Sequence, residues 1–416
     1  MHIVHVTHRA WPLVGGSERY VHEIARRQVL DGHQVTVVAS VADDFSALWE
    51  QRGRRVGTAV PVEQEGVRLR RLSLRYLPLG WLAFPLLRRV TWAMSHIATA
   101  AALTLARFSP WVPDLPTVLA EERADLYFAW NITLEGLTAA VARAARQQGV
   151  PWLAVPVLHL ARSHFYVMPH QMALLRQASA VLVQTASERD FVLGRGFAAE
   201  QVHIVSPGID PAEGRDADGR RFCLRYGVEG PLVVTLGRLC RDKGTLHLLA
   251  AARRLWTEGR PLTLALLGPQ EADVRRALAA LPQRFRPFCV APGLVSEEDK
   301  WDALEAAQVV ALPSRTESFG IVFLEGWLKG KPVVGARAGA VPDVIEDGVD
   351  GLLVPFGDVP ALAGALAALL DDPQRAAQMG CRGQQKALQR YTWDLQYARL
   401  RQIVEAVCAA RPGFLE

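Results

Sequence analysis

Short, continuously apolar runs alternate with helical patterns along most of this chain, and this alternation limits the folds that it can adopt. In the first half, strands are expected at residues 2–6, 34–39, 126–130, 152–158 and 180–184, and helices at residues 17–30, 134–147 and 166–176. Strands that are apolar at every position are typical of a parallel sheet that helices cover on both faces. The pattern therefore predicts an α/β fold.

The same alternation begins again after a polar, glycine-containing stretch at residues 207–219. Strands are expected at residues 232–236, 262–267, 288–291, 309–312, 332–336 and 352–354, and helices at residues 243–256, 271–281, 297–306, 319–328 and 360–370. A chain of 416 residues is long enough for two or three domains. We therefore predict two doubly wound domains, residues 1–210 and 211–392, with a helix at 393–416 packing back on the first. Such sheets bind ligands at the carboxyl ends of their strands, so we expect the site in a cleft between the domains.

The charge and cysteine content indicate which binding partners and which cellular compartment are expected for this chain. The chain has 47 Lys and Arg against 42 Asp and Glu, and this net charge of +5 is too evenly spread to indicate nucleic acid binding. Only five of these cations are lysine, which we attribute to genome composition. Five scattered cysteines without a CxxC pair are typical of a reducing compartment. The N-terminus predicts a strand and not a signal peptide, so the expected location is the cytoplasm.

Residues 75–113 interrupt the alternation with aromatic residues, arginines and an alanine-rich helix expected at 92–107. The apolar run at 90–106 is short and contains histidine, so it does not predict a membrane span. One interpretation is a buried helix of the first domain, which we favour. The other is an interfacial helix that makes peripheral contact with lipid at the inner membrane face.

The first motif with functional content is Pro-Ser-Arg-Thr-Glu-Ser-Phe-Gly-Ile-Val-Phe-Leu-Glu at residues 313–325. A helix is expected to begin near residue 318, so the amides of residues 318–320 would suit a phosphate or a sugar hydroxyl. Glu317 and Glu325 are eight residues apart, which is about 12 Å along a helix axis at 1.5 Å per residue. Two carboxylates at this separation cannot share a metal or a proton, but they can bind two ends of one extended ligand.

The second motif is Leu-Gly-Arg-Leu-Cys-Arg-Asp-Lys-Gly at residues 236–244, where a strand ends and a helix is expected to begin. Gly237 permits a tight turn. Arg238 and Lys243 place two cations at the carboxyl end of the sheet, and a guanidinium with an ammonium suits a diphosphate.

The third motif follows the first strand and contains Gly15, Gly16 and Ser17. Two glycines let the backbone approach a ligand, and Ser17 can cap the following helix. The loop has neither the GK[ST] ending of a Walker loop nor a GxGxxG pattern, so a nicotinamide or flavin cofactor is disfavoured.

In this order, the three motifs resemble those of retaining glycosyltransferases of the GT-B fold, and more narrowly of family 4, the glycosyl transferases group 1. The matching patterns are E-x7-E at residues 317–325, Gly-Arg-x4-Lys-Gly at residues 237–244, and Gly-Gly at residues 15–16. The similarity covers nearly the whole chain, is strongest at about 230–357 and is weakest at 41–120. It implies two Rossmann-like domains that face each other across a cleft. It also implies metal-independent transfer of a hexosyl group from a nucleotide-diphosphate sugar to a glycan or glycolipid acceptor.

The resemblance assigns a role to each motif residue. Arg238 and Lys243 would hold the diphosphate. Glu325 would bind the ribose hydroxyls, and Glu317 the donor sugar. The other positions implied for donor binding are Gly15, Gly16, Gly237, Gly293, Leu294, Ser318, Phe319 and Gly320. A histidine facing the reacting sugar would be His159, although His164 and His170 compete with it by position.

Two segments need separate interpretation. Residues 339–343, Gly-Ala-Val-Pro-Asp, replace the usual Gly-Gly-x-Pro-Glu, so this loop should still turn while its ligand contacts stay open. Residues 216–218 spell Asp-Ala-Asp without a preceding strand, and we interpret them as a solvated turn and expect no metal site. Two alternatives to a transferase are a GT-B sugar-nucleotide epimerase and a sugar-nucleotide binder without turnover.

Overall fold

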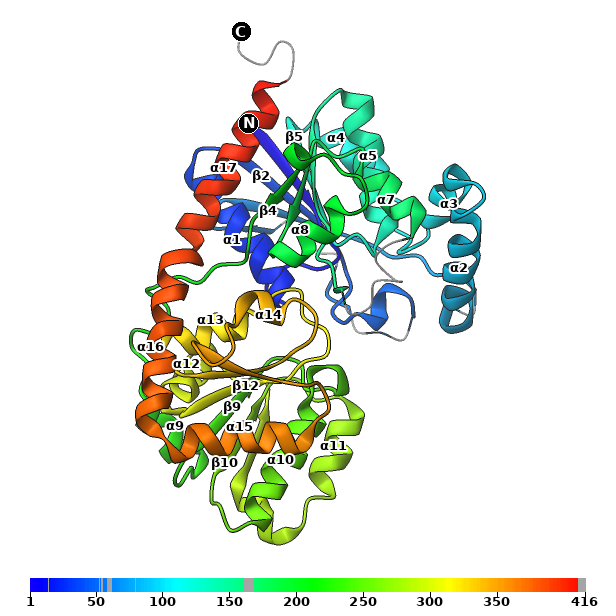
Figure 1. Ribbon diagram of the computed structural model, residues 1–416. Helices are drawn as coiled ribbons and strands as arrows, with labels where there is room; N and C mark the ends of the chain where they lie inside the picture. Colours follow the sequence, from blue (N-terminus) through cyan, green and yellow to red (C-terminus); the bar gives the residue numbers. More distant parts are fainter. Residues whose placement is uncertain are drawn as a thin grey trace. The chain divides into compact units, whose positions relative to one another are not determined.

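The computed structural model describes residues 1–13, 15–51, 53, 55–57, 62–78, 80–160 and 168–410. Within these residues the chain forms two compact units, each with its own sheet (Figure 1). The first unit holds the described residues of 1–158, 168–205 and 397–410, and the second holds His159, Leu160 and Ser206–Gln396. The chain passes from one unit to the next between Val205 and Ser206, shortly before the boundary predicted at residue 210.

The sheet of the first unit has the order β3-β4-β2-β1-β5-β6-β7-β8 among the described strands. All neighbouring pairs are parallel except β3 with β4. The strands are β1 (His2–Val6), β2 (Gln34–Ser40), β3 (Val62–Gln64), β4 (Val67–Leu72), β5 (Leu126–Trp130), β6 (Trp152–Val155), β7 (Ala180–Val183) and β8 (Val202–Ile204). Since the chain starts in the middle and builds outward in both directions, the sheet is doubly wound with its switch point between β1 and β5.

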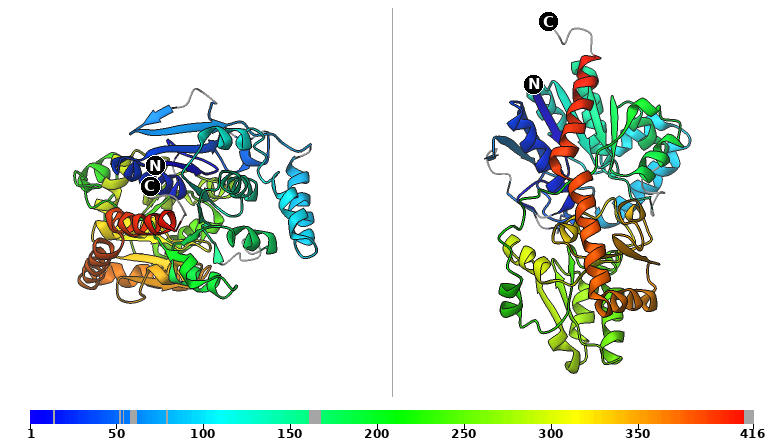
Figure 2. Two further views of the ribbon diagram at one scale, coloured as in Figure 1. Left: turned by 90° about the horizontal axis from the view of Figure 1, so that it is seen from above. Right: turned by 60° about the vertical axis from the view of Figure 1, so that its left-hand side comes forward.

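The described helices of this unit include one pair, α2 and α3, at its margin (Figures 1 and 2). They are α1 (Gly16–Leu30), α2 (Gly80–Ser95), α3 (Thr99–Ala106), α4 (Leu115–Glu122), α5 (Glu135–Gln148), α7 (Pro169–Leu175) and α8 (Ala186–Leu193). The single helix predicted at 92–107 is wrong, because the chain turns between Ser95 and Thr99. The Ser95 hydroxyl donates to the Trp92 carbonyl at 2.6 Å, and such side-chain bonds compete with helix continuation.

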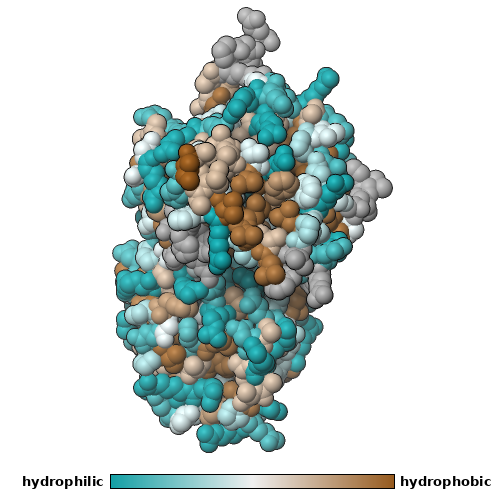
Figure 3. All heavy atoms as spheres, turned by 90° about the vertical axis from the view of Figure 1, so that its right-hand side faces the viewer, coloured by the Kyte–Doolittle hydropathy of each residue, from teal (hydrophilic) through white to brown (hydrophobic). Residues whose placement is uncertain are grey.

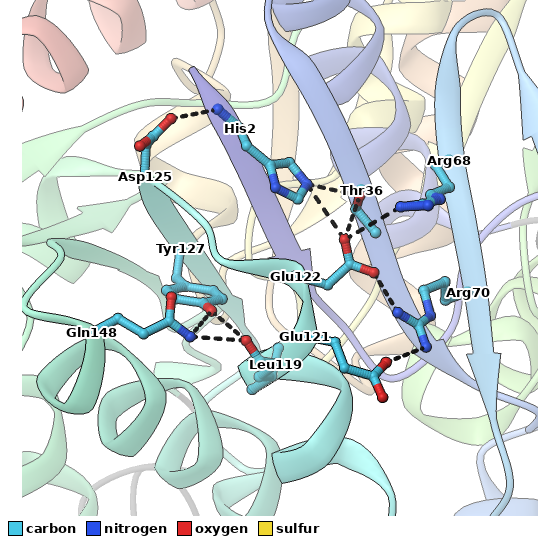
Figure 4. A network of polar contacts seen from close by, with 10 residues as sticks. All are labelled: His2, Thr36, Arg68, Arg70, Leu119, Glu121, Glu122, Asp125, Tyr127 and Gln148. Carbon is cyan, nitrogen blue, oxygen red and sulfur yellow. Dashed lines mark hydrogen bonds and ion pairs between the residues drawn. The ribbon is translucent and has the colours of Figure 1, made fainter.

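Strand β4 was not predicted, because arginines interrupt its apolar run. The structure accommodates them with one buried carboxylate, Glu122 at the end of α4 (Figure 4). Arg70 donates to Glu122 at 2.5 Å, and Arg68 lies 3.6 Å from the same carboxylate. Thr36 donates to Glu122 at 3.1 Å, and His2 Nε2 lies 3.4 Å from it. The charged strand is therefore held by a network that joins four elements.

The sheet of the second unit has the order β11-β10-β9-β12-β13-β14 and is parallel throughout. Its strands are β9 (Leu232–Leu236), β10 (Thr263–Leu267), β11 (Cys289–Gly293), β12 (Val309–Leu312), β13 (Val333–Ala336) and β14 (Gly351–Val354). In chain order this is the 3-2-1-4-5-6 arrangement of a dinucleotide-binding fold, with its switch point between β9 and β12. The predicted strands of this unit are all present.

Helices cover both faces of this second sheet. They are α9 (Gly219–Tyr226), α10 (Thr245–Thr257), α11 (Ala272–Ala279), α12 (Glu297–Ala306), α13 (Ile321–Leu328), α14 (Val341–Val344), α15 (Val359–Asp371) and α16 (Pro373–Arg390). Successive strand residues enter opposite clusters: Val233 packs with Leu248 and Leu366, whereas Val234 packs with Phe323 and Trp327. This alternation fixes which side of each strand faces which helices.

Helix α17 (Trp393–Ala409) begins in the second unit and belongs to the first from Tyr397 onward. The Tyr397 hydroxyl donates to Asp31 Oδ2 at 2.8 Å, beside the end of α1. Among the described helices, none combines the length and the apolar character that a membrane-spanning segment needs.

Candidate functional site

Two of the predicted motifs lie side by side at the switch point of the second sheet. Strands β9 and β12 are paired neighbours, so the loops that leave their carboxyl ends meet at one edge. The loop after β9 contains residues 237–244, and the loop after β12 contains residues 313–320. The topology thus brings together residues more than 70 positions apart in the sequence.

Close backbone contacts join these two loops. A Cβ atom on Gly244 would lie 2.1 Å from the Pro313 carbonyl oxygen, and Gly244 also has a φ of +73°. The Arg315 amide donates to the Asp242 carbonyl at 2.8 Å, and the side chains of the same two residues pair at 2.5 Å. Gly244 is therefore required both for its left-handed backbone and for the space that it leaves.

The central contact is an ion pair between Lys243 and Glu317. Lys243 Nζ lies 2.5 Å from Glu317 Oε1, and the two side chains are 24% and 9% exposed. Each motif supplies one partner of the pair. A carboxylate this deeply buried needs a compensating charge, and Lys243 provides it.

A third loop, which follows β13, supports the backbone of Glu317. The Ala340 amide donates to the Glu317 carbonyl at 3.2 Å. A Cβ atom on Gly339 would lie only 2.8 Å from the same oxygen. The segment that departs from the family pattern therefore turns as expected, and α14 begins within it.

The chain between Glu317 and α13 differs from the prediction in its helix start. Helix α13 begins at Ile321, after Gly320, whose φ is +92°. The amides of residues 318–320 thus precede the helix instead of forming its first turn. The Phe319 side chain is 2% exposed and packs edge-to-face against Tyr391, so only the backbone of Phe319 can serve a ligand.

Glu325 lies on α13 and is also buried and paired with a lysine. Its residue is 5% exposed, and Lys300 Nζ on α12 lies 3.2 Å from Glu325 Oε1. Lys300 also contacts Glu297 and lies over the ring of Trp301. The sequence analysis missed Lys300. The rarity of lysine in this chain was the available signal, because both glutamates of the motif pair with one.

Arg238 has a more exposed setting than Lys243. It pairs with Glu271 at 2.6 Å, and the two side chains are 60% and 45% exposed. A pair this exposed contributes little to stability, so Arg238 can exchange Glu271 for an anionic ligand at small cost.

Glycines let the backbones at the ends of β9, β10 and β11 approach one another. A Cβ atom on Gly268 would lie 2.0 Å from the Gly237 carbonyl oxygen. The Gly268 amide donates to the Gly293 carbonyl at 2.7 Å. Gly293 has open space around it, and the following Leu294 is 62% exposed.

The glycine loop of the first unit lies at the switch point of its own sheet, after β1. Gly15 precedes α1, and Gly16 is the first residue of that helix. A Cβ atom on Gly15 would lie 2.0 Å from Glu18 Oε2, and Glu18 is buried and bound by Arg9 at 2.6 Å. Burial lowers the pKa of the neighbouring His8 to about 4, despite the opposing effect of Glu18. The Arg9–Glu18 pair was not predicted.

The three candidate histidines differ in their settings. His159 follows β6, is partly buried and groups with the second unit. His164 lies outside the described residues. His170 is fully buried on α7, with Nε2 3.5 Å from Glu135 Oε1, which is a structural setting.

Residues 216–218 lie directly before α9. Asp218 caps α9 by accepting from the Arg220 amide at 2.9 Å. Throughout the part of the chain that the structure describes, no three His, Cys, Asp or Glu side chains gather as metal ligands would.

Two family models match this chain. One, described as "Glycosyl transferase 4-like domain", matches residues 15–208, and the other, described as "Glycosyl transferases group 1", matches residues 230–372. Together they include the described loops of both units.

Relatives and solved structures agree with these matches. An alpha-D-kanosaminyltransferase from Streptomyces kanamyceticus is 33% identical over 212 residues, 49% of this chain and 54% of that protein. A GDP-mannose-dependent alpha-(1-6)-phosphatidylinositol monomannoside mannosyltransferase from Mycolicibacterium smegmatis is 35% identical over 53% of this chain and 60% of its own length. The matches therefore span little more than half the length of these relatives. The crystal structure of Anabaena Alr3699/HepE in complex with UDP and glucose has a TM-score of 0.71 at 21% identity, covering 98% of this chain and 100% of that chain.

Proposed function

Because the chain belongs to the glycosyl transferases group 1 family and has the GT-B fold, we propose that it is a glycosyltransferase with a nucleotide-diphosphate sugar as donor. The observation that carries this proposal is the joined pair of loops after β9 and β12, where Lys243 meets Glu317. The names of two similar proteins support the donor class, since one is GDP-mannose-dependent and the other was crystallised with UDP and glucose. The group transferred would be a hexosyl group.

The described geometry supports a role for each donor-binding residue of the second unit. Lys243 would turn from Glu317 toward the diphosphate, and Arg238 would exchange Glu271 for it. Glu317 would then accept hydrogen bonds from the donor sugar, with the backbone of residues 318–320 beside it. Glu325, held by Lys300, would accept hydrogen bonds from the ribose hydroxyls. Leu294 and the open backbone at Gly293 would contact the base.

The first unit would contribute two further contacts. The Gly15–Gly16 backbone would approach the phosphates, and His159 would contact the donor sugar.

The proposed reaction retains the anomeric configuration and uses no metal ion. The acceptor hydroxyl attacks the anomeric carbon on the face that the diphosphate leaves. The bond between that carbon and the phosphate oxygen breaks, and the hydroxyl proton passes to the leaving phosphate. Lys243 and Arg238 stabilise the negative charge that grows on the diphosphate, a role in which fixed cations contribute strongly to rate. No side chain serves as nucleophile in this scheme.

The proposed acceptor is a glycan or a lipid-linked glycan, and the proposed location is the cytoplasm with peripheral contact to a membrane through residues 75–113. One similar protein is named for a phosphatidylinositol monomannoside acceptor, which supports a lipid-linked class.

Ligand-dependent thermal stability tests the donor class. The protein is heated with UDP, GDP or ADP separately in the presence of EDTA. A nucleotide at 100 times its Kd should add about 2.7 kcal/mol of stability, and stabilisation in EDTA supports metal independence. NMR of the product anomer, made from the matching donor, then tests retention. Release of an epimerised sugar from donor alone would favour the epimerase, and binding without turnover would favour the non-catalytic binder.

A further inference from the structure

Helix α2 exposes its large apolar side chains to solvent. Leu82, Leu86 and Val90 are 52%, 61% and 43% exposed, and their spacing of four residues places them on one face. Trp92 is 52% exposed and Ile97, just after the helix, is 82% exposed. On the side of the molecule that carries α2 and α3, apolar residues form a broad patch on the surface (Figure 3). The interpretation of residues 75–113 as a buried helix is therefore wrong for the face of α2 that carries Leu82, Leu86 and Val90.

The opposite face of α2 is polar and buried. Thr91 and Ser95 are each 3% exposed, and Arg88 is ion-paired with Glu135 on α5, which is fully buried. Glu135 also accepts from Gln171 at 2.7 Å and from Ser109 at 3.0 Å. Burial alone would raise the pKa of Glu135, but the adjacent His170 and the charge of Arg88 hold this pKa below its usual value.

This anchoring fixes which way the helix faces. Turning α2 to bury its leucines would pull Arg88 away and leave the Glu135 carboxylate buried without that cation, which is strongly unfavourable. Most surface helices of soluble proteins show the reverse arrangement, with the apolar stripe facing the core. The outward apolar face is thus a stable property of the fold.

The charge of the surrounding segment is one-sided. Residues 66–113 contain seven arginines and neither aspartate nor glutamate. Several of these arginines pair within the unit, whereas Arg75, Arg89 and Arg107 are exposed. An apolar helix face among exposed arginines, without acidic neighbours in the segment, complements an anionic lipid surface.

We propose that α2 lies in the interface of an anionic lipid bilayer. Leu82, Leu86, Val90, Trp92 and Ile97 would enter the boundary between headgroups and acyl chains. The exposed arginines would bind lipid phosphates, since guanidinium and phosphate pair well. This inference rests on the membrane contact given under the proposed function and deepens it, and it is independent of the transfer reaction.

The test is cosedimentation of the full chain with vesicles, without any nucleotide. One set of vesicles contains phosphatidylglycerol and phosphatidylcholine in equal parts, and the other contains phosphatidylcholine alone. We expect the wild type to bind the anionic vesicles more tightly, with binding that weakens as salt rises. The double variant Leu82→Ser, Leu86→Ser should bind at least about tenfold more weakly, since a buried leucine contributes strongly to partition.

A matched control carries the same chemical change elsewhere. Leu30 and Leu224 are 72% and 74% exposed and lie on α1 and α9. The double variant Leu30→Ser, Leu224→Ser should bind vesicles like the wild type. A second pair of variants compares Arg89→Glu on α2 with Arg375→Glu on α16. The two variants have the same net charge, but only Arg89→Glu should weaken binding to the vesicles. Circular dichroism melting of every variant checks that each is folded.

Several outcomes would overturn the proposal. These are no wild-type binding to anionic vesicles, equal binding by the two leucine variants, or equal wild-type binding to neutral vesicles. A concentration-dependent dimer that the α2 variant loses, without vesicle binding, would assign the face to a second copy of the chain. Nucleotide stabilisation and turnover with a soluble acceptor test the transferase proposal separately, so either proposal can fail alone.

Discussion

The carboxyl edges of the two sheets carry corresponding loops but are built differently. In the second unit, three loops are locked together around Glu317: Gly244 against Pro313, Lys243 against the carboxylate, and Ala340 on the carbonyl. In the first unit, the contacts around Gly15 come from Glu18 and Arg9, which are close to it in sequence. In the second unit, loops that are distant in sequence therefore fix the position of a buried ion pair. The Gly15 loop, in contrast, is held by residues close to it in sequence, and it offers mainly its own backbone to a ligand.

Lysine marks this difference between the units. All five lysines belong to the second unit, and each is partly buried with its ammonium on a carboxylate or a carbonyl. We attribute the abundance of arginine to genome composition, which does not explain this placement of the lysines. A compact ammonium fits positions where the forked guanidinium would not, and two of these positions hold the motif glutamates.

The largest expected effect comes from removing the central cation. Lys243→Ala should lower kcat about 10²- to 10³-fold, because the leaving diphosphate loses a fixed positive charge. The control is Lys386→Ala, which removes a lysine paired with Asp350 and bonded to the Val344 carbonyl, and which should affect stability but not kcat. Donor turnover and thermal melting of both variants separate the two roles, and a wild-type kcat in Lys243→Ala would contradict the site.

Acidification should affect the first unit through β1. Trp130 Nε1 donates to His5 Nδ1 at 3.1 Å, so the imidazole proton lies on Nε2 and donates to Gln28 at 2.7 Å. Burial lowers the pKa of His5 to about 4, although the Gln28 hydrogen bond opposes this. The unfolded chain then binds a proton more readily than the folded chain below pH about 6.5, and stability falls as the pH falls toward 4.

The expected loss is on the order of 3 kcal/mol for His5, and it should disappear in His5→Gln. Denaturant unfolding over this pH range measures it, with hydrogen exchange to assign the loss to the first unit. His96→Gln, at an exposed histidine of α2–α3, is the control and should leave the pH slope unchanged. His8 is also buried with a pKa lowered to about 4, so part of the pH dependence should remain in His5→Gln. A pH slope in His5→Gln as steep as that of the wild type would rule out His5 as a source.

Two glycine substitutions separate loop interlocking from backbone strain. Gly244 and Gly227 both have left-handed backbones, with φ of +73° and +63°, but only Gly244 is in close contact, while Gly227 has open space. Gly227→Ala should cost about 1–2 kcal/mol of unfolding free energy from strain alone. Gly244→Ala should cost at least about 1 kcal/mol more, because the methyl group meets Pro313. Urea unfolding measures both, and equal losses would show that the interlocking contact is unimportant.

The smallest expected effect concerns Glu325. Lys300→Met should raise the Kd of the nucleoside diphosphate about tenfold, because Glu325 loses the cation that orients it, while kcat at saturating donor changes less. Lys329→Met, which removes a similar pair with Glu305, should leave the Kd unchanged. Isothermal titration provides the measurement. A wild-type Kd in Lys300→Met would assign that lysine to packing alone.

The strands of the second unit and the motif loops could be predicted from sequence because their signals are local. Apolar runs predicted β9 to β14, and the doubly wound order then placed the loops after β9 and β12 next to each other. The Lys243–Glu317 pair could not be predicted, because it depends on how loops 74 residues apart turn toward each other. Strand β4 was missed because its arginines are stabilised by Glu122, which is far away in the sequence. The interfacial interpretation of residues 75–113 was considered but not favoured. Hydrophobicity alone does not show which face of a helix is exposed, and the Arg88–Glu135 pair that fixes this face of α2 depends on tertiary contacts.

The course of α17 has a consequence for biosynthesis. Residues 397–410 belong to the first unit, although every residue of the second unit precedes them in the chain. The ribosome therefore releases a complete second unit before it releases the segment that finishes the first. Tyr397 must then return to Asp31 across a separation of 366 residues, and contacts this distant slow the completion of folding. During translation the surface at the end of α1 therefore stays uncovered until these residues are made, and incompletely packed intermediates of this kind are prone to aggregate.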